Sequence, residues 1–392
     1  MMAQHDNCSM DVNQAQALLG GLSPVQFMRR HWQKKPLLVR QAIAGVAPTV
    51  TRAQMFALVA RDDVESRLVQ RHAGDRWQLR HGPLPRRDLP PLAQRDWTLL
   101  VQGLDLHVDA AHALLSRFRF VPAARLDDVM LSYASDGGGV GPHIDSYDVF
   151  LLQVQGRRRW RIGPSAGRRP APLRDDVPLK MLARFEPEHE WLLEAGDMLY
   201  LPPGWAHDGV AVGGDCMTTS IGFRAPRADE LAQALLVRLA DAADAADEAQ
   251  PAPRYRDPAQ AATTTPAAMP EALQRFANEA IRRALAEPRA IARTLGEWLT
   301  EPKAQVWFEA ANPAVQNAGR GVQLDRRSRM AYDTRLIFIN GESLRASGRD
   351  ARLMRTLADQ RRLDARAVLA ASTEARALLD EWLANGWLQP SA

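Results

Sequence analysis

The stretch Gly141-Pro142-His143-Ile144-Asp145 decides most of what can be expected of this 392-residue chain, together with Gly196-Asp197-Met198-Leu199-Tyr200-Leu201-Pro202-Pro203-Gly204-Trp205-Ala206-His207. Side chains alternate along a strand, so His143 and Asp145 project to the same side. Two imidazoles and one carboxylate can cover one face of an octahedral metal ion and leave three positions open, as in non-haem Fe(II) oxygenases. We therefore predict that His143, Asp145 and His207 ligate a metal ion and form the catalytic centre.

Both stretches fit the sequence motifs of the cupin barrel. Five residues separate Gly137 from His143, and the run from Gly196 to His207 has the spacing Gly-x5-Pro-x-Gly-x2-His. Asp145 replaces the second histidine of the first motif, the later glutamate of that motif is missing, and Ala211 stands where an asparagine is expected. These departures turn a four-ligand site into a three-ligand site with vacant positions. A His-x-Asp pair by itself is a weak signal, and the surrounding motifs supply the specificity.

The chain between 129 and 224 consists of short β-rich runs broken by Gly and Pro, which is typical of a sandwich or barrel. A tight turn is expected at Gly156, so that Arg157-Arg158-Arg159 begins a new strand after the strand of the metal ligands, and alternation sends Arg158 to one face and its two neighbours to the other. A single inward guanidinium near the metal suits a dicarboxylate: it can grip the distal carboxylate while a 2-oxo acid group chelates the metal. This favours 2-oxoglutarate as co-substrate, with Ser132 as a further hydrogen-bond donor. The alternative is that all three arginines form a solvated face.

Two carboxylates and an aromatic residue near the predicted ligands suit a cationic substrate. Asp136 precedes three glycines at the expected mouth of the site, and Asp148 follows Tyr147 directly after the ligands. Tyr147 could stack on a substrate side chain. The alternatives are that Asp136 is a turn residue and that Tyr147 is ordinary packing. Asp197 is expected to support a turn and not to ligate metal.

Composition changes along the chain predict several units. Residues 1–20 are expected to be a flexible N-terminus, residues 21–226 the catalytic domain, residues 227–300 a helical region and residues 301–392 a third unit. The helices of 227–300 carry apolar faces but are too few to enclose a core, which favours a homodimer, with packing inside the chain as the alternative. In the third unit, a strand entering an Asn-Gly turn and three later helices resemble a winged helix.

The bulk composition is that of a soluble globular protein, with 46% apolar and 24% charged residues and a net charge of +4. Residues 301–392 hold 14 Lys plus Arg against 11 Asp plus Glu, a balance that argues against nucleic-acid binding there. No apolar run approaches the ~18 residues needed to cross a bilayer. The two cysteines, Cys8 and Cys216, do not suggest a disulfide. A cytoplasmic protein is therefore expected.

The motifs together resemble those of the JmjC-type ribosomal oxygenases, specifically the bacterial 2-oxoglutarate-dependent ribosomal-protein arginine hydroxylases. The resemblance rests on residues 137–150, 156–161, 202–209 and 220–226, and on the early run around Phe27 and Trp32. It implies an α+β chain with a JmjC/cupin double-stranded β-helix barrel, a helical dimerisation region and a C-terminal winged-helix-like domain. It also implies hydroxylation of an arginine side chain in a large-subunit ribosomal protein.

Carried over position by position, the resemblance gives each candidate residue a role. It implies that His143, Asp145 and His207 bind Fe(II), that Arg158 and Ser132 bind 2-oxoglutarate, that O₂ is consumed, and that Asp136 and Tyr147 face the substrate. Three alternatives stay open. The chain could be a demethylase or hydroxylate another protein residue, or it could be a non-enzymatic cupin regulator binding DNA through its last domain. A small-molecule cupin dioxygenase would not need the 160 residues that follow the barrel.

Overall fold

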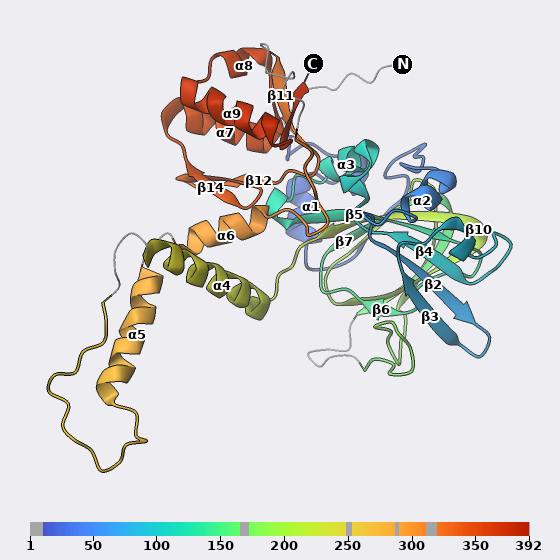
Figure 1. The fold of residues 1–392 in the computed structure, drawn as a ribbon. Coiled ribbons are helices and arrows are strands. Elements are labelled where there is room, and N and C mark those ends of the chain that lie inside the picture. The colour runs from blue at the N-terminus through green and yellow to red at the C-terminus, as the bar shows by residue number, and fades with distance from the viewer. Residues whose placement is uncertain (1–10, 165–171, 248–252, 287–289, 311–319, 392) are drawn as a thin grey trace. The chain divides into compact units, whose positions relative to one another are not determined.

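The computed structural model describes residues 11–164, 172–247, 253–286, 290–310 and 320–391 (Figure 1). Cys8 and the first half of the predicted flexible N-terminus lie outside the described residues. The chain divides into two compact units, Met1–Ala225 with Ala304–Trp307, and Pro226–Lys303 with Phe308–Ala392. No helix among the described residues is long and apolar enough to span a membrane.

The first unit is built on an antiparallel sheet that folds over into two layers. β3-β2-β4-β5 continue through one half of β10 and of β7 to β9 and β1, while β6 and β8 pair with the other halves of β10 and β7. The strands are β1 (Leu37–Val39), β2 (Ser66–His72), β3 (Arg76–His81), β4 (Trp97–Val101), β5 (Leu126–Ala134), β6 (His143–Ile144), β7 (Val149–Pro164), β8 (His189–Glu194), β9 (Met198–Leu201) and β10 (Trp205–Phe223).

The two long strands, β7 and β10, pass from one layer to the other at a β-bulge. Their register shifts between Val212 and Met217, opposite Gly156, whose φ is +67°. A Cβ on Gly156 would lie 2.9 Å from the carbonyl oxygen of Asp215, so only glycine fits. The sequence predicted a tight turn at Gly156 between two strands, and this is wrong. β7 continues through Gly156 as one bent strand. The extra residues of the bulge lie between Val212 and Met217 of its partner strand β10, which is distant in the sequence.

Helices cover the outer face of the larger layer and enclose the main core. The helices of this unit are α1 (Pro24–Arg30), α2 (Arg52–Leu58) and α3 (Asp109–Ser116), and α1 begins with a capping box of Ser23 and Gln26. Four short 3-10 turns complete the unit: η1 (Ala17–Leu19), η2 (Arg86–Asp88), η3 (Leu104–Leu106) and η4 (Ala123–Arg125). Leu18 and Leu19 are buried in the core, so the expectation of a flexible end is wrong for these residues.

A second, smaller apolar cluster combines residues from both layers and therefore lies between them. It contains Val149, Leu151, Trp160, Ile162, Leu193, Leu199 and Leu201. The two faces of β7 consequently contribute to different cores. Side chains on its inner face belong to this smaller cluster, whereas Phe150 and Leu152 on its outer face belong to the main core. This two-layer arrangement is the barrel that the sequence predicts.

The second unit contains the remaining helices and two small sheets. They are α4 (Ala228–Asp247), α5 (Glu271–Ala286), α6 (Ala290–Thr300), α7 (Gly348–Gln360), α8 (Ala365–Leu369) and α9 (Thr373–Ala384), with strands β11 (Gly321–Leu324), β12 (Met330–Tyr332), β13 (Leu336–Ile339), β14 (Glu342–Arg345), β15 (Arg362–Leu363) and β16 (Leu388–Ser391). The Asn340-Gly341 turn joins β13 to β14 with φ of 47° and 91°, as the sequence predicts. A division of this unit near residue 300 stays a prediction.

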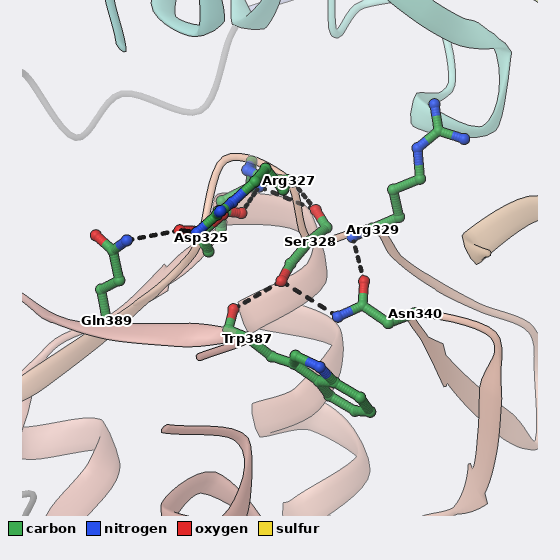
Figure 2. Close-up of polar contacts among 8 residues, drawn as sticks. Asp325, Arg327, Ser328, Arg329, Asn340, Trp387 and Gln389 are labelled. Atoms are coloured by element: carbon green, nitrogen blue, oxygen red, sulfur yellow. Dashed lines mark hydrogen bonds and ion pairs between the residues drawn. The ribbon is translucent and has the colours of Figure 1, made fainter. Parts of the chain in front are cut away.

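A buried carboxylate organises the loop between β11 and β12 (Figure 2). Asp325 is 1% exposed and accepts hydrogen bonds from the guanidinium of Arg327 (2.8 Å) and the amide of Gln389 (2.6 Å). Burial alone would raise the pKa of Asp325, but these contacts from Arg327 lower it overall. Arg361 donates to the backbone carbonyls of Asp325 and Ser328. The Asp325 carboxylate thus pairs with the charge of Arg327, whereas backbone carbonyls only hold Arg361 in place.

Candidate metal centre

The three predicted ligands meet because β6 pairs with β10. His207 on β10 lies directly opposite His143 on β6, and their ring centroids are 4.2 Å apart. Asp145 follows β6, with its carboxylate oxygens 4.0 Å from His143 Nε2 and 3.6 Å from His207 Nε2. Among the described residues, these form a group whose potential ligand atoms all lie within 4.8 Å of one another. The geometry suits a single ion bound by two nitrogens and one oxygen.

Backbone carbonyls orient both imidazoles. Nδ1 of His143 lies 2.9 Å from the carbonyl oxygen of Gly141, and Nδ1 of His207 lies 2.9 Å from that of Trp205. An Nδ1–H that donates to a carbonyl leaves the Nε2 lone pair free to point at the centre. Burial, aided by the proximity of His143, lowers the pKa of His207 to about 4. His207 is therefore neutral at pH 7, which is the form that binds metal ions.

Tight packing holds the loop that carries the first two ligands. Gly141 has a φ of +77°, and a Cβ there would collide with the buried Met181. The carbonyl oxygen of Asp145 accepts a hydrogen bond of 2.9 Å from the backbone N–H of Gly204. The glycines of both motifs thus allow close backbone approach, and the loop cannot shift without breaking these contacts.

Arg158 lies on the inner face of β7 and lacks a partner for part of its guanidinium. It is 4% exposed, whereas Arg157 and Arg159 on the opposite face are exposed, as strand alternation predicts. Its Nε and Nη2 are buried without a hydrogen-bond partner. An unpaired buried charge is costly, so this position fits an anion such as a carboxylate.

Trp160 connects Arg158 to the three candidate ligands, and the sequence reasoning did not single it out. The Arg158 guanidinium carbon lies 5.6 Å from the Trp160 ring centroid, and that ring lies 5.9 Å from the ring of His207. Trp160 Nε1 is also buried without a partner. The signal was its spacing of two residues from Arg158, which places both side chains on one face of a strand.

Ser132 also faces the interior of the barrel. It pairs with Thr218 of β10, and its neighbours Leu131 and Tyr133 point the other way into the main core. Its hydroxyl donates to the carbonyl oxygen of Thr218 at 3.2 Å. The structure thus places Ser132 on the correct face but already provides an acceptor for its hydroxyl proton.

Asp136 follows β5 and contacts β10 at Gly213, farther along that strand than His207. Its carboxylate accepts a hydrogen bond of 2.9 Å from the N–H of Gly213 and forms an ion pair with Arg95. The following N–H, of Gly137, donates to the carbonyl of Ala211, which is the strand partner of Arg158. Asp136 therefore supports a turn at the Arg158 end of the strand.

Tyr147 and Asp148, which were also expected near the substrate, differ in burial. Tyr147 is 38% exposed, and desolvation together with the charges of Asp145 and Asp128 raises the pKa of its hydroxyl. Asp148 is fully buried and accepts hydrogen bonds from Tyr200 (2.6 Å) and Gln33 (3.1 Å). The suggestion that Asp148 attracts a substrate is wrong, because its side chain points away from Tyr147 into the core.

Gly209 allows Trp160 to lie across β10, and we expect Gly209→Ala to disturb the site. A Cβ there would lie 2.6 Å from the indole ring. Overpacking of this kind costs about 1–3 kcal/mol, and the displaced ring would move away from Arg158 and His207. The loss of stability should lower the midpoint temperature of thermal unfolding. In a Trp160→Leu background the same substitution should cost much less, and equal costs in both backgrounds would refute the collision.

Comparison with protein families agrees with both units. Residues 113–231 match the JmjC domain family, and residues 281–389 match the ROXA-like winged helix. The barrel with its His-x-Asp…His centre thus matches a JmjC domain, and the later residues match a winged helix.

Two individual proteins are similar to this chain in sequence. The chain is 38% identical over 208 residues to the ribosomal protein uL16 3-hydroxylase of Escherichia coli (strain K12), covering 52% of this chain and 53% of the relative. It is 35% identical over 214 residues to a probable ribosomal oxygenase of Haemophilus influenzae, covering 54% and 52%. The alignments thus span about half the length of the curated relatives. The chain is thus similar to known ribosomal oxygenases over this half.

Solved structures extend the similarity of fold to nearly the whole chain. The X-ray structure of E. coli ycfD has a TM-score of 0.79 and 28% sequence identity, covering 93% of this chain and 97% of that chain. A structure of YcfD, a ribosomal oxygenase from E. coli in complex with cobalt and 2-oxoglutarate, has a TM-score of 0.76 and 28% identity, covering 95% and 99%.

Proposed function

We propose that this chain is an Fe(II)- and 2-oxoglutarate-dependent oxygenase that hydroxylates a ribosomal protein. The observation that carries the proposal is a two-histidine, one-carboxylate centre beside a buried guanidinium with free donors, that of Arg158. The similar protein YcfD was solved with cobalt and 2-oxoglutarate, which supports both the metal and the co-substrate.

In this proposal His143 Nε2, the Asp145 carboxylate and His207 Nε2 hold the iron. When bound, iron with 2-oxoglutarate and O₂ supplies the oxidising power to hydroxylate an unactivated C–H bond. Arg158 binds the distal carboxylate of 2-oxoglutarate, since a charge-assisted contact would satisfy its orphan donors. Trp160 packs against this guanidinium and excludes water from it.

We further propose uL16 as the substrate protein and an arginine side chain as its target. The first relative is named as a uL16 hydroxylase. Tyr147 offers an exposed aromatic face close to Asp145, a combination that attracts a guanidinium through cation–π and charge interactions. Asp136 could contribute a second carboxylate, although Arg95 already neutralises it.

Peptide mass mapping tests this proposal directly. The iron-loaded protein is incubated with 2-oxoglutarate, O₂ and a mixture of large-subunit ribosomal proteins, with a reaction lacking 2-oxoglutarate as control. A gain of one oxygen on an arginine of uL16 is expected. Oxygen on a histidine, or loss of a methyl group from lysine, would overturn the arginine assignment; relatives named as bifunctional demethylase and histidyl-hydroxylase make these outcomes informative. The absence of any modification would refute the oxygenase.

We also propose that the chain forms a homodimer through its helical region. Leu273, Ile281 and Leu285 of α5 are 41%, 63% and 41% exposed and recur on one helical face. Ile281→Asp should convert a dimer to a monomer in light scattering, whereas Leu369→Asp, at an exposed apolar position of α8, should not. A monomeric unsubstituted protein would rule out the dimer.

A further inference from the structure

The second unit contains a cavity of about 930 Å³ whose charged lining residues are all arginines. It is formed by α6, the β12–β13 turn, β14 and the start of α7. The arginines come from each of these segments and are Arg293, Arg335, Arg345, Arg352 and Arg355. All the lining residues are described, and none is acidic. Five guanidinium groups on converging segments make this a strongly positive site.

Backbone carbonyls hold one of these guanidinium groups without neutralising it. Arg355 Nη2 donates to the carbonyl oxygens of Asp333 (3.2 Å) and Thr334 (2.9 Å), and its guanidinium lies 5.3 Å from the ring centroid of Tyr332. Its Nε is buried with no partner. A carbonyl acceptor fixes the position of a cation but leaves its charge in place.

Three acidic residues near the cavity do not line it, and hydroxyl or backbone N–H donors of the unit hold their carboxylates in place. Asp350, in the first turn of α7, accepts a hydrogen bond of 2.8 Å from Ser372 Oγ. Glu297 accepts one of 2.6 Å from Ser343 Oγ, and the Asp333 carboxylate accepts from the backbone N–H groups of Arg335 and Leu336. Arg335, Arg345 and Arg352 are exposed, and no side-chain contact is recorded for them among the described residues. They differ in this from Arg327, whose guanidinium pairs with the Asp325 carboxylate (Figure 2).

We propose that this cavity binds the phosphate groups of an RNA strand. Guanidinium groups pair with phosphate oxygens in bidentate fashion, and a cavity of about 930 Å³ with arginines on four segments accommodates several phosphates in succession. The choice of RNA over a free phosphorylated metabolite rests on the proposed function, because a ribosomal-protein substrate is met together with RNA. The balance of 14 basic to 11 acidic residues across 301–392 concealed this site, because it averages over the clustering.

Fluorescence anisotropy with a labelled 20-nucleotide single-stranded RNA tests the proposal on the full chain. A chelator and the omission of 2-oxoglutarate keep oxygenase activity out of the measurement, so failure of the proposed function would not affect the result. Arg345→Gln/Arg352→Gln is compared with Arg366→Gln/Arg376→Gln, which removes the same charge from exposed arginines outside the cavity. Circular dichroism verifies folding, and Arg335→Gln provides a single cavity variant should the double variant fail to fold.

The cavity variant should bind RNA about tenfold more weakly than the control variant. The plot of log K against log salt concentration should have a slope smaller by about 1.4 for this variant. Each phosphate contact on a single strand contributes about 0.7 to that slope, and the variant removes two such contacts. Equal weakening in both double variants would overturn the site. Absence of RNA binding by the unsubstituted chain, or saturable binding of ADP or pyrophosphate that RNA does not displace, would overturn the assignment to RNA.

Discussion

Asp145→Ala should reduce substrate-stimulated succinate formation to the background of a protein-free reaction. An imidazole that binds a metal ion contributes no negative charge, so the substitution removes the anionic ligand of the centre together with its oxygen atoms. The affinity of the proposed centre for a divalent ion therefore depends on this carboxylate. Calorimetric titration with Co(II) or Mn(II), alongside the succinate assay, separates lost metal binding from lost turnover.

Asp62→Ala is the matched control for this substitution. Asp62 is an exposed aspartate of the same unit, so its removal changes the net charge equally without touching the centre. Normal metal binding and succinate formation are expected for it. If Asp145→Ala retained substrate-stimulated turnover, the assignment of the three ligands would be incorrect.

Arg158→Ala should raise the 2-oxoglutarate concentration needed for half-maximal turnover by a factor of about 100 or more. Removing one partner of a buried, hydrogen-bonded charge pair typically costs 2–5 kcal/mol or more, and a factor of 100 corresponds to about 2.7 kcal/mol. Turnover at saturating co-substrate should fall much less, because Arg158 is not one of the proposed metal ligands. Initial rates across a range of 2-oxoglutarate concentrations measure both quantities.

Arg157→Ala is the control for this kinetic assay, since the Arg157 side chain lies on the exposed face of the same strand.

Thermal unfolding gives a second, independent test of the role of Arg158. Without 2-oxoglutarate, Arg158→Met should be at least as stable as the unsubstituted protein, because it removes an unpaired buried charge. Adding 2-oxoglutarate should stabilise the unsubstituted protein alone. An unchanged apparent affinity in Arg158→Ala would place the anchor for the co-substrate at another residue.

Patterns within a few residues predicted much of the fold and of the site. The spacing of His143 and Asp145, the alternation around Arg158 and the Asn340-Gly341 turn all depend on local geometry, and the structure agrees with each. The prediction of a turn at Gly156 failed because a glycine with positive φ serves both turns and bulges. Only the partner strand distinguishes the two.

The sequence by itself determined which residues are available as ligands and on which face of its strand each lies, because strand alternation is a property of the local backbone. The tertiary structure alone decided which of them meet. The register of β10 brings His207 opposite His143, whereas packing buries Asp148 beside Tyr200 and leaves Nε and Nη2 of Arg158 without acceptors. It also gathers arginines from distant segments around one cavity. Each of these depends on pairing between residues far apart in the chain, and no short pattern records it.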